Sequence, residues 1–113
     1  MRQVFEAPDR GDVVLLSFGP RGRGEAGTLS RPAVVLSPRA YNARVGLAVL
    51  CPVVAEVKGY PFEVPLPPGL PVAGAILADQ VHSLDWRARR AERVCSLPPG
   101  IVEEALGKAR ALL

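Results

Sequence analysis

The sequence predicts a mainly β fold, a small antiparallel barrel or sandwich, with one helix at the C-terminal end. Five or six short apolar runs, many of them rich in β-branched residues, follow one another and are separated by glycine- and proline-containing turns. No helical pattern lies between these runs, so we expect neighbouring strands to pair antiparallel. The chain of 113 residues is long enough for one domain, spanning 1–113, to bury a single core.

Three strands are predicted in the first half, at 13–18, 32–37 and 47–54. A loop rich in glycine and arginine separates the first two, and a polar connection at 38–44 separates the next two. The loop has no apolar pattern that could bury it, so it is either a binding segment or a solvated hairpin tip. Pro52 has no N–H for a ladder, which predicts an edge strand or a bulge at this point.

The second half predicts shorter strands and then a helix. Residues 60–64 alternate aromatic and polar side chains, residues 65–71 form a proline-rich surface loop, and 73–78 is a strand that 79–84 extends. The segment 96–99, Ser-Leu-Pro-Pro, is a helix-start signal. Apolar residues then recur at helical spacing from 101 to 113, which predicts a helix that packs on the core.

Charge and composition are ordinary for a soluble globular protein, and the basic residues are mostly arginine. The apolar fraction is 49%, the charged fraction is 22% and the net charge is +3, with twelve of the fourteen basic residues being arginine. Arginine favours bidentate recognition of phosphate or carboxylate, although a GC-rich genome gives the same bias. With no signal peptide and no apolar run of about 18 residues, a cytoplasmic protein without membrane association is expected.

The two cysteines are predicted to be free. Cys51 and Cys95 match no metal-ligand spacing, and both lie in apolar surroundings where a thiol packs as a small hydrophobic side chain. A disulfide between them is the less favoured alternative.

Six stretches of the sequence carry a family resemblance through their order and separation. They are Gly11–Val13, Arg31–Pro38, Tyr41–Asn42, Lys58–Val64, Ala78–Val81 and Trp86–Arg89. Each alone is a weak signal, but the ordered set closely resembles the MazF/PemK family of toxin endoribonucleases. The resemblance extends from Gly11 to the C-terminus.

The resemblance implies a fold, an activity and partners. The fold would be a PemK-like, SH3-related antiparallel barrel with a C-terminal helix, working as a homodimer. The activity would be cleavage of single-stranded RNA at short sequences without a metal or other cofactor, leaving 2′,3′-cyclic phosphate and 5′-hydroxyl ends. A cognate MazE-like antitoxin would cover the RNA groove with an acidic, extended tail, to which a cationic groove is complementary.

Two catalytic residues are carried over from the resemblance. Arg31 matches the family's catalytic arginine, and its expected role is to stabilise the phosphorane through paired N–H donors. A guanidinium does not readily deprotonate, so proton transfer is not expected of it. Glu25 lies where relatives carry a loop glutamate, and it would act as a base or position Arg31; a solvent-facing glutamate is the alternative.

One position departs from the family pattern. The family threonine after the proline of the third strand is replaced by Val54, which has a similar shape but no hydroxyl for a phosphoryl oxygen. Thr28 or Ser30 in the preceding loop would supply the hydroxyl instead, or a main-chain N–H would act there. We therefore place all three residues among the substrate-binding positions.

The remaining candidates are outside this catalytic group. Lys58 is expected to contact phosphate and Gln80 to read a base edge, whereas Arg87 either contacts phosphate or holds the fold. Trp86 is expected in the core or at a dimer interface. His82 is the single histidine, and its place in an alternating stretch favours a non-catalytic interpretation.

Two rival functions stay open on the sequence alone. One is a non-enzymatic toxin on the same scaffold that poisons DNA gyrase by binding, as CcdB-type proteins do. The other, prompted by Val54, is a family member that binds RNA with weakened cleavage.

Overall fold

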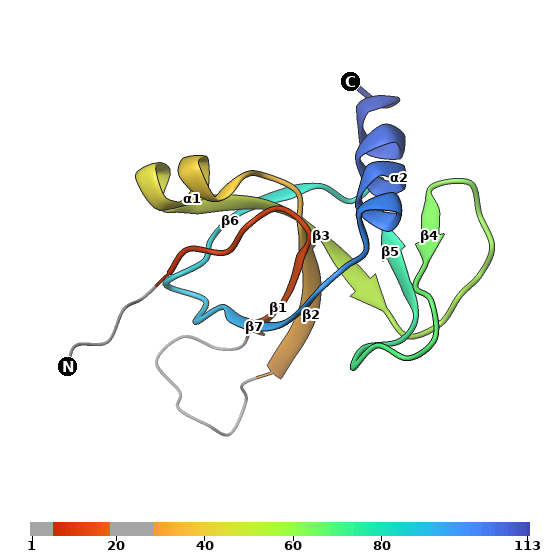
Figure 1. Ribbon diagram of the computed structural model, residues 1–113, viewed down its shortest axis with the longest axis horizontal. Coiled ribbons are helices and arrows are strands. Elements are labelled where there is room, and N and C mark those ends of the chain that lie inside the picture. Colours follow the sequence, from red (N-terminus) through yellow and green to blue (C-terminus); the bar gives the residue numbers. More distant parts are fainter. Residues whose placement is uncertain (1–5, 19–28) are drawn as a thin grey trace.

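The computed structural model describes residues 6–18 and 29–113 of the chain (Figure 1). In these ranges it contains seven strands and two helices in the order β1 (Asp12–Phe18), β2 (Leu29–Val35), α1 (Arg39–Val45), β3 (Leu47–Val54), β4 (Glu63–Pro65), β5 (Ala75–Leu77), β6 (His82–Asp85), β7 (Glu92–Ser96) and α2 (Pro99–Arg110). The predicted mainly β fold with a C-terminal helix is confirmed.

All strand pairs are antiparallel, and the sheet is open. The strand order is β4-β5-β3-β2-β1-β7, with β6 paired to β3 beside this path. Because β4 and β7 lie at the two ends of this order, the described strands do not close on themselves. The small SH3-related antiparallel barrel that the resemblance implies is here an open, branched sheet, with α1 against β3 and α2 against β4 (Figure 1).

The branch point lies on β3, which is a central strand and not the predicted edge. It pairs with β2 along one side, while on the other side Leu47–Leu50 pair with β6 and Val53–Val54 pair with β5. Pro52 lies in the short gap between these two partners, where a missing N–H costs no ladder bond. The proline is accommodated by a change of partner.

Both faces of the sheet are buried, so the strands read as continuous apolar runs. Neighbouring residues alternate between two cores: Val34 joins the first and Val35 the second, and likewise Cys51 and Leu50. The first core includes α2, and the second is completed by Ala7 and by Trp86. Trp86 is fully buried and donates its indole N–H to the Asn42 carbonyl at 2.9 Å, which confirms its expected place in the core.

The connection predicted at 38–44 is a helix, α1. Its sequence lacks an apolar stripe, since Asn42 is its one buried residue, and that absence concealed it. The Asn42 side chain donates to the carbonyls of Pro8 and Ser37 and accepts from the Ser37 hydroxyl. Gly46, at φ +83°, ends the helix in the left-handed region that favours glycine.

The second half differs from the prediction mainly in its strand boundaries. The strand predicted at 60–64 begins at Glu63, and the predicted extension at 79–84 is a turn followed by the separate strand β6. Strand β7 was not predicted, because Glu92 and Arg93 mask its pattern. Helix α2 buries four residues on one face, but the helix ends before Leu112 and Leu113, which are exposed.

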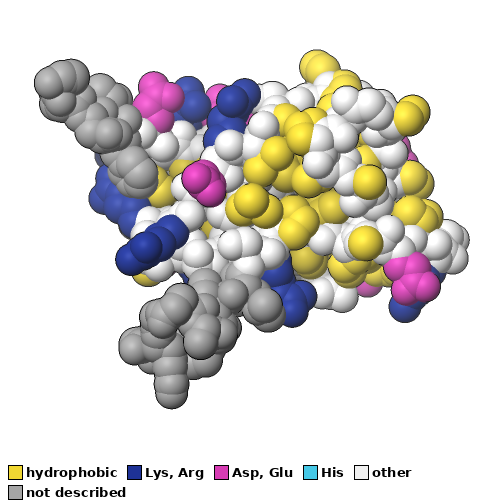
Figure 2. Space-filling view, turned by 90° about the horizontal axis from the view of Figure 1, so that it is seen from below, with side chains coloured by type: hydrophobic (Ala, Val, Ile, Leu, Met, Phe, Trp, Pro, Cys, Tyr) yellow, Lys and Arg dark blue, Asp and Glu magenta, His cyan; other side chains and the backbone are white. Residues whose placement is uncertain are grey.

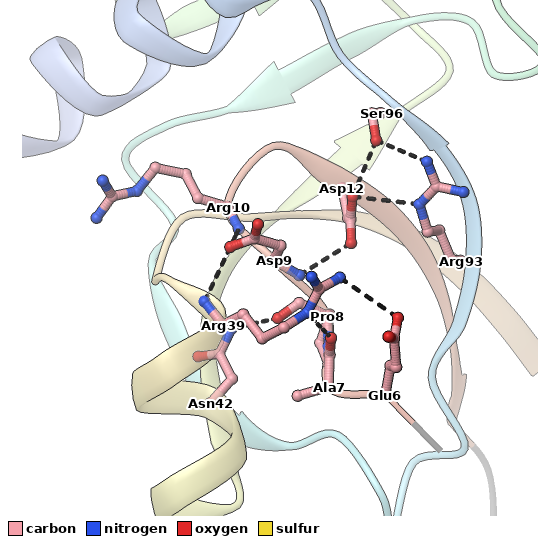
Figure 3. Close-up of polar contacts among 10 residues, drawn as sticks. All are labelled: Glu6, Ala7, Pro8, Asp9, Arg10, Asp12, Arg39, Asn42, Arg93 and Ser96. Atoms are coloured by element: carbon pink, nitrogen blue, oxygen red, sulfur yellow. Dashed lines mark hydrogen bonds and ion pairs between the residues drawn. The ribbon is translucent and has the colours of Figure 1, made fainter. Parts of the chain in front are cut away.

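A network of charged side chains ties the start of the fold to α1 and β7 (Figure 3). Asp12 is 4% exposed; its carboxylate accepts from the Asp9 N–H at 2.9 Å and from the Ser96 hydroxyl at 3.0 Å. Arg93 donates to Asp12 at 3.3 Å and to Ser96 at 2.8 Å. Arg39 donates its Nε–H to the Ala7 carbonyl at 2.8 Å. The charges in this network are used for folding.

The cysteines are free, as predicted. Cys51 is buried and Cys95 is partly buried, and both pack in the first core. Burial, and to a lesser degree the negative charge of Asp79, raises the pKa of the Cys51 thiol to about 12. This thiol therefore stays protonated at neutral pH.

Candidate functional site

Arg31 projects from β2 just beyond the second core. It lies opposite Leu16 of β1, and the neighbouring β2–β3 ladder begins two residues later, at the Ala33–Pro52 pair. Alternation along β2 places Arg31 on the same face as Ala33 and Val35, which are buried in the second core. The arginine thus continues a core face into solvent, where it is exposed.

An open pocket of about 320 Å³ lies against Arg31. Its walls come from β1, β2, β3 and β6, and its lining residues are Leu16, Arg31, Pro32, Ala33, Leu50, Cys51, Pro52, His82 and Leu84. The pocket lies where β3 changes its partner from β6 to β5, so that none of the described strands pairs with Pro52 on that side. Almost all of the pocket wall is apolar, because Arg31 and His82 line it through their carbon atoms and their nitrogen atoms contribute almost nothing to the wall.

Neither Arg31 nor His82 uses its side chain to hold the fold within the described part of the chain. No hydrogen bond or ion pair in residues 6–18 and 29–113 involves the guanidinium or the imidazole. A guanidinium beside an apolar pocket suits a ligand that carries both a phosphate and a flat apolar group. A nucleotide has these two properties.

Lys58 lies on a loop that a buried carboxylate holds in place. Glu63 is 3% exposed, and its carboxylate accepts from the Lys58 N–H at 2.9 Å and from the Gly59 N–H at 2.6 Å. Main-chain donors of a turn that converge on one carboxylate fix that turn strongly. The Lys58 side chain starts from this fixed turn and is exposed.

A second contact ties this loop to the turn that carries Gln80. The Tyr60 hydroxyl donates to Asp79 at 2.8 Å, and the Ala78 N–H donates to the Phe62 carbonyl at 3.0 Å. The hydrogen bond to Asp79, with smaller contributions from partial burial and nearby charge, raises the pKa of Tyr60. The loops that carry Lys58 and Gln80 are therefore one connected unit.

Val54 lies at the end of β3, beside the pocket strands. It pairs with Ala75 of β5 and lies two residues past Pro52, so strand alternation gives the two residues the same face. Its main chain is closely packed, because a Cβ added to Gly74 would overlap the Val54 carbonyl. Gly74 itself has φ +121°, a conformation that favours glycine.

The other sequence candidates have different surroundings. Ser30 is exposed on β2 next to Arg31. The Arg87 guanidinium lies over the Trp86 ring, 4.8 Å from its centroid, and Arg87 is not among the pocket residues. Glu25 and Thr28 lie outside the described residues.

The structure thus groups the candidates differently from the sequence. Arg31 lines the pocket, Lys58 and Gln80 share a tied pair of loops, and His82 joins Arg31 although the sequence favoured a non-catalytic role for it. The alternation of His82 and Leu84 was visible in the sequence. The pairing of His82 with Leu50 and of Leu84 with Ala48 of β3 was not.

Charged and apolar side chains divide the face shown in Figure 2. Lys and Arg side chains gather near the grey segments, and hydrophobic side chains cover much of the other half. Across residues 6–18 and 29–113, no three His, Cys, Asp or Glu side chains come together as a possible metal-ligand set. No helix in the same ranges is long and apolar enough to cross a membrane.

Comparison with known proteins decides the family. Residues 9–113 match the family described as PemK-like, MazF-like toxin of type II toxin–antitoxin system. The chain belongs to this family. The endoribonuclease toxin MazF of Escherichia coli (strain K12) is 42% identical over 107 residues, 94% of each chain. The endoribonuclease toxin ChpB of the same strain is 34% identical over 110 residues, 93% of each chain.

Solved structures agree with this assignment to the PemK/MazF family. A crystal structure of MazE–MazF (Form-III) from Deinococcus radiodurans matches this chain with a TM-score of 0.85 and 50% identity, covering 94% of this chain and 95% of that one. The fold and the order of the matched stretches therefore agree with the resemblance seen in the sequence. The family match over residues 9–113 includes the pocket strands and both tied loops.

Proposed function

We propose that this toxin is a sequence-specific, metal-independent endoribonuclease that cleaves single-stranded RNA. Membership of the PemK/MazF family and the endoribonuclease names of its relatives favour this function over gyrase poisoning. The observation that carries the proposal is Arg31, an exposed arginine with no partner in the described part of the chain, at the mouth of an apolar pocket.

The pocket supports transesterification by the RNA's own 2′-hydroxyl. This oxygen attacks the adjacent phosphorus, and a pentacoordinate phosphorane forms with extra negative charge on its non-bridging oxygens. The two forked N–H groups of Arg31 bind those oxygens and stabilise the charge. The products are a 2′,3′-cyclic phosphate and a 5′-hydroxyl.

Residues around the pocket supply binding and specificity in this proposal. Lys58 contacts a phosphate from its fixed turn, and Gln80 reads a base edge through its amide. Ser30 precedes Arg31 on β2 but lies on the opposite face by strand alternation, so it is a weaker candidate than Thr28 for the hydroxyl that Val54 lacks. Glu25 and Thr28, from the preceding loop, complete the set as a base or positioning group and as a second hydroxyl.

The proposed partners follow from the same chemistry. The toxin acts as a homodimer, and a cognate acidic antitoxin of the MazE type inhibits it by occupying the cationic RNA site. A similar protein, MazF of Deinococcus radiodurans, has been crystallised as MazE–MazF, which supports a MazE-type partner. The RNA substrate places the activity in the cytoplasm.

One experiment tests activity, specificity and end chemistry together. Purified protein is incubated with a long RNA in the presence of EDTA, and the fragment ends are mapped. We expect cuts at one short sequence with cyclic phosphate ends, and none with Arg31→Ala. Intact RNA at high enzyme excess would contradict the nuclease proposal, and cleavage that EDTA stops would contradict metal independence.

A Val54→Thr variant tests whether the missing hydroxyl at this position weakens cleavage by the natural chain. If the missing hydroxyl limits the rate, this variant cleaves faster than the natural chain. An unchanged or lower rate shows that another group already fills that role.

A further inference from the structure

The change of partner along β3 places His82 at the pocket. Leu50 and His82 form the last β3–β6 pair, and β3 next pairs with β5 at Val53. His82 is therefore the first residue of β6, at the open edge of the gap that forms the pocket. In antiparallel strands, paired residues share a face, so His82 lies on the face of Leu50 that continues to Arg31.

His82 differs from the other pocket residues in its proton chemistry. Among the nine lining residues, the side chains that carry an exchangeable proton are Arg31, Cys51 and His82. A guanidinium holds its protons too tightly to transfer them. The Cys51 thiol, with its pKa raised to about 12 by burial, is equally unsuited. An imidazole can both give up and accept a proton, and it is the side chain used most often as a general acid or base.

The cleavage reaction requires a proton donor for the departing 5′-oxygen. The departing 5′-oxygen is an alkoxide unless it is protonated as the P–O bond breaks, and general acids assist such steps by roughly 10²–10⁴-fold. Arg31 stabilises charge on the phosphorane but provides no transferable proton. His82 is exposed at the pocket edge, and within residues 6–18 and 29–113 no hydrogen bond or ion pair engages its imidazole.

We propose that His82 is the general acid that protonates the leaving 5′-oxygen of an RNA whose scissile phosphate lies on Arg31. This inference rests on the proposed endoribonuclease activity. The 2′-oxygen–phosphorus bond forms and the phosphorus–5′-oxygen bond breaks, and the imidazolium N–H proton passes to the 5′-oxygen. The 2′-hydroxyl proton leaves to solvent, and the neutral imidazole regains a proton from solvent before the next turnover.

A leaving-group substitution separates general acid catalysis from other roles. Single-turnover cleavage is measured on a short RNA that contains the mapped target sequence, and on the same RNA with sulfur in place of the scissile 5′-oxygen. A thiolate leaves without protonation. With His82→Ala we expect a loss of roughly 10²–10³-fold on the oxygen substrate, and a rate close to that of the natural chain on the sulfur substrate.

Two further variants complete the design. Ser83→Ala changes the neighbouring exposed residue of β6, which alternates to the other face, and should match the natural chain on both substrates. His82→Gln keeps size and polarity but transfers no proton, so it should behave as His82→Ala does. Thermal unfolding midpoints of all variants show that the fold is retained.

The outcomes distinguish this inference from the proposed function. An unchanged rate for His82→Ala on the oxygen substrate overturns the role, and so does an equal loss on both substrates, which indicates binding or positioning. If the natural chain cleaves neither substrate, the nuclease proposal fails and this inference fails with it. Cleavage that depends on Arg31 but not on His82 leaves the nuclease proposal standing and removes only the general acid.

Discussion

Arginine side chains in two regions of this molecule differ in whether they are hydrogen-bonded to the rest of the fold. In the network of Figure 3, Arg39 and Arg93 are bonded to carbonyl, hydroxyl and carboxylate oxygens of the fold. At the pocket, Arg31 has no such partner among the described residues. The same residue type is structural in one region and available to a ligand in the other. The arginine-rich composition could not distinguish these cases, because only the surrounding oxygen atoms do.

The difference has a physical cause in how the charges are satisfied. A charge-assisted hydrogen bond that is already formed inside the fold must be broken before the same N–H can bind a phosphate. Arg10 illustrates this, since its Nε–H donates to the Leu36 carbonyl at 2.6 Å. Within residues 6–18 and 29–113, Arg31 has no such bond to break before it binds RNA.

The largest expected effect comes from replacing one arginine in each region and comparing the two variants. Arg31→Ala should lower cleavage by roughly 10³-fold, by analogy with the loss of an oxyanion donor, and leave the unfolding midpoint unchanged. Arg39→Ala should keep the cleavage rate and lower the free energy of unfolding by about 1–2 kcal/mol, because it removes a hydrogen bond to the Ala7 carbonyl. Single-turnover kinetics and urea unfolding measure the two quantities.

The two variants serve as controls for each other. The distinction fails if Arg31→Ala unfolds more easily than Arg39→Ala. It also fails if the loss of cleavage rate in each variant follows its loss of unfolding free energy. Both arginines would then act on cleavage only through the stability of the fold.

A buried charge that supports the tied loops should give the next largest effect. Glu63→Ala leaves the Lys58 and Gly59 N–H groups without their acceptor, which should lower the free energy of unfolding by about 2–4 kcal/mol. Glu63→Gln keeps one oxygen acceptor and should lose less. Urea unfolding of the pair gives both values. Equal losses for alanine and glutamine would show that the two N–H groups contribute little.

The sequence predicted the parts of the fold that depend on local patterns. The apolar runs at 47–54 and 101–113 located β3 and most of α2, because both segments bury residues at a regular period. Helix α1 was missed because one polar residue, Asn42, is its whole buried face. Strand β7 was missed because its outward residues are charged and its partner, β1, lies far away in the sequence.

The site was predictable to the extent that one residue carried its own signal. Arg31 follows the loop and precedes a recognisable strand, so the family resemblance located it. The pocket depends on the change of partner near Pro52, a pairing between distant segments that no local pattern encodes. For the same reason the sequence separated His82 from Arg31, whereas the sheet places both at one pocket.

The hydrogen bonds of the Asp9 carboxylate in this network should make the stability of the fold depend on pH. The Arg39 main-chain N–H, the Arg10 N–H and nearby positive charge lower the pKa of Asp9 below its ordinary 3.8, against a smaller opposing effect of burial. The stabilisation is therefore fully present above pH 3.8 and is lost as the pH falls through the lowered value. Asp9→Asn should be less stable at neutral pH, and this deficit should shrink in acid.

A surface carboxylate provides the matched control for this titration. Glu103 is exposed on α2, and Glu103→Gln should follow the natural chain at every pH when urea midpoints are compared between pH 7 and pH 2.5. If the deficit of Asp9→Asn is the same at all pH values, the Asp9 charge does not contribute to the network.

The smallest effect tests whether a fold contact can act on the binding region. Tyr60→Phe removes the hydroxyl that joins the Lys58 loop to Asp79, next to Gln80, while the ring keeps its packing. Both partners are solvent-accessible, so the unfolding midpoint should hardly move. The turn that carries Gln80 should move more freely, and discrimination between bases at one position of the target should fall by about two- to fivefold, a fraction of a full base contact. Fragment-end mapping on a randomised RNA measures this ratio, and an unaltered cleavage pattern would show that the Gln80 turn is set without Tyr60.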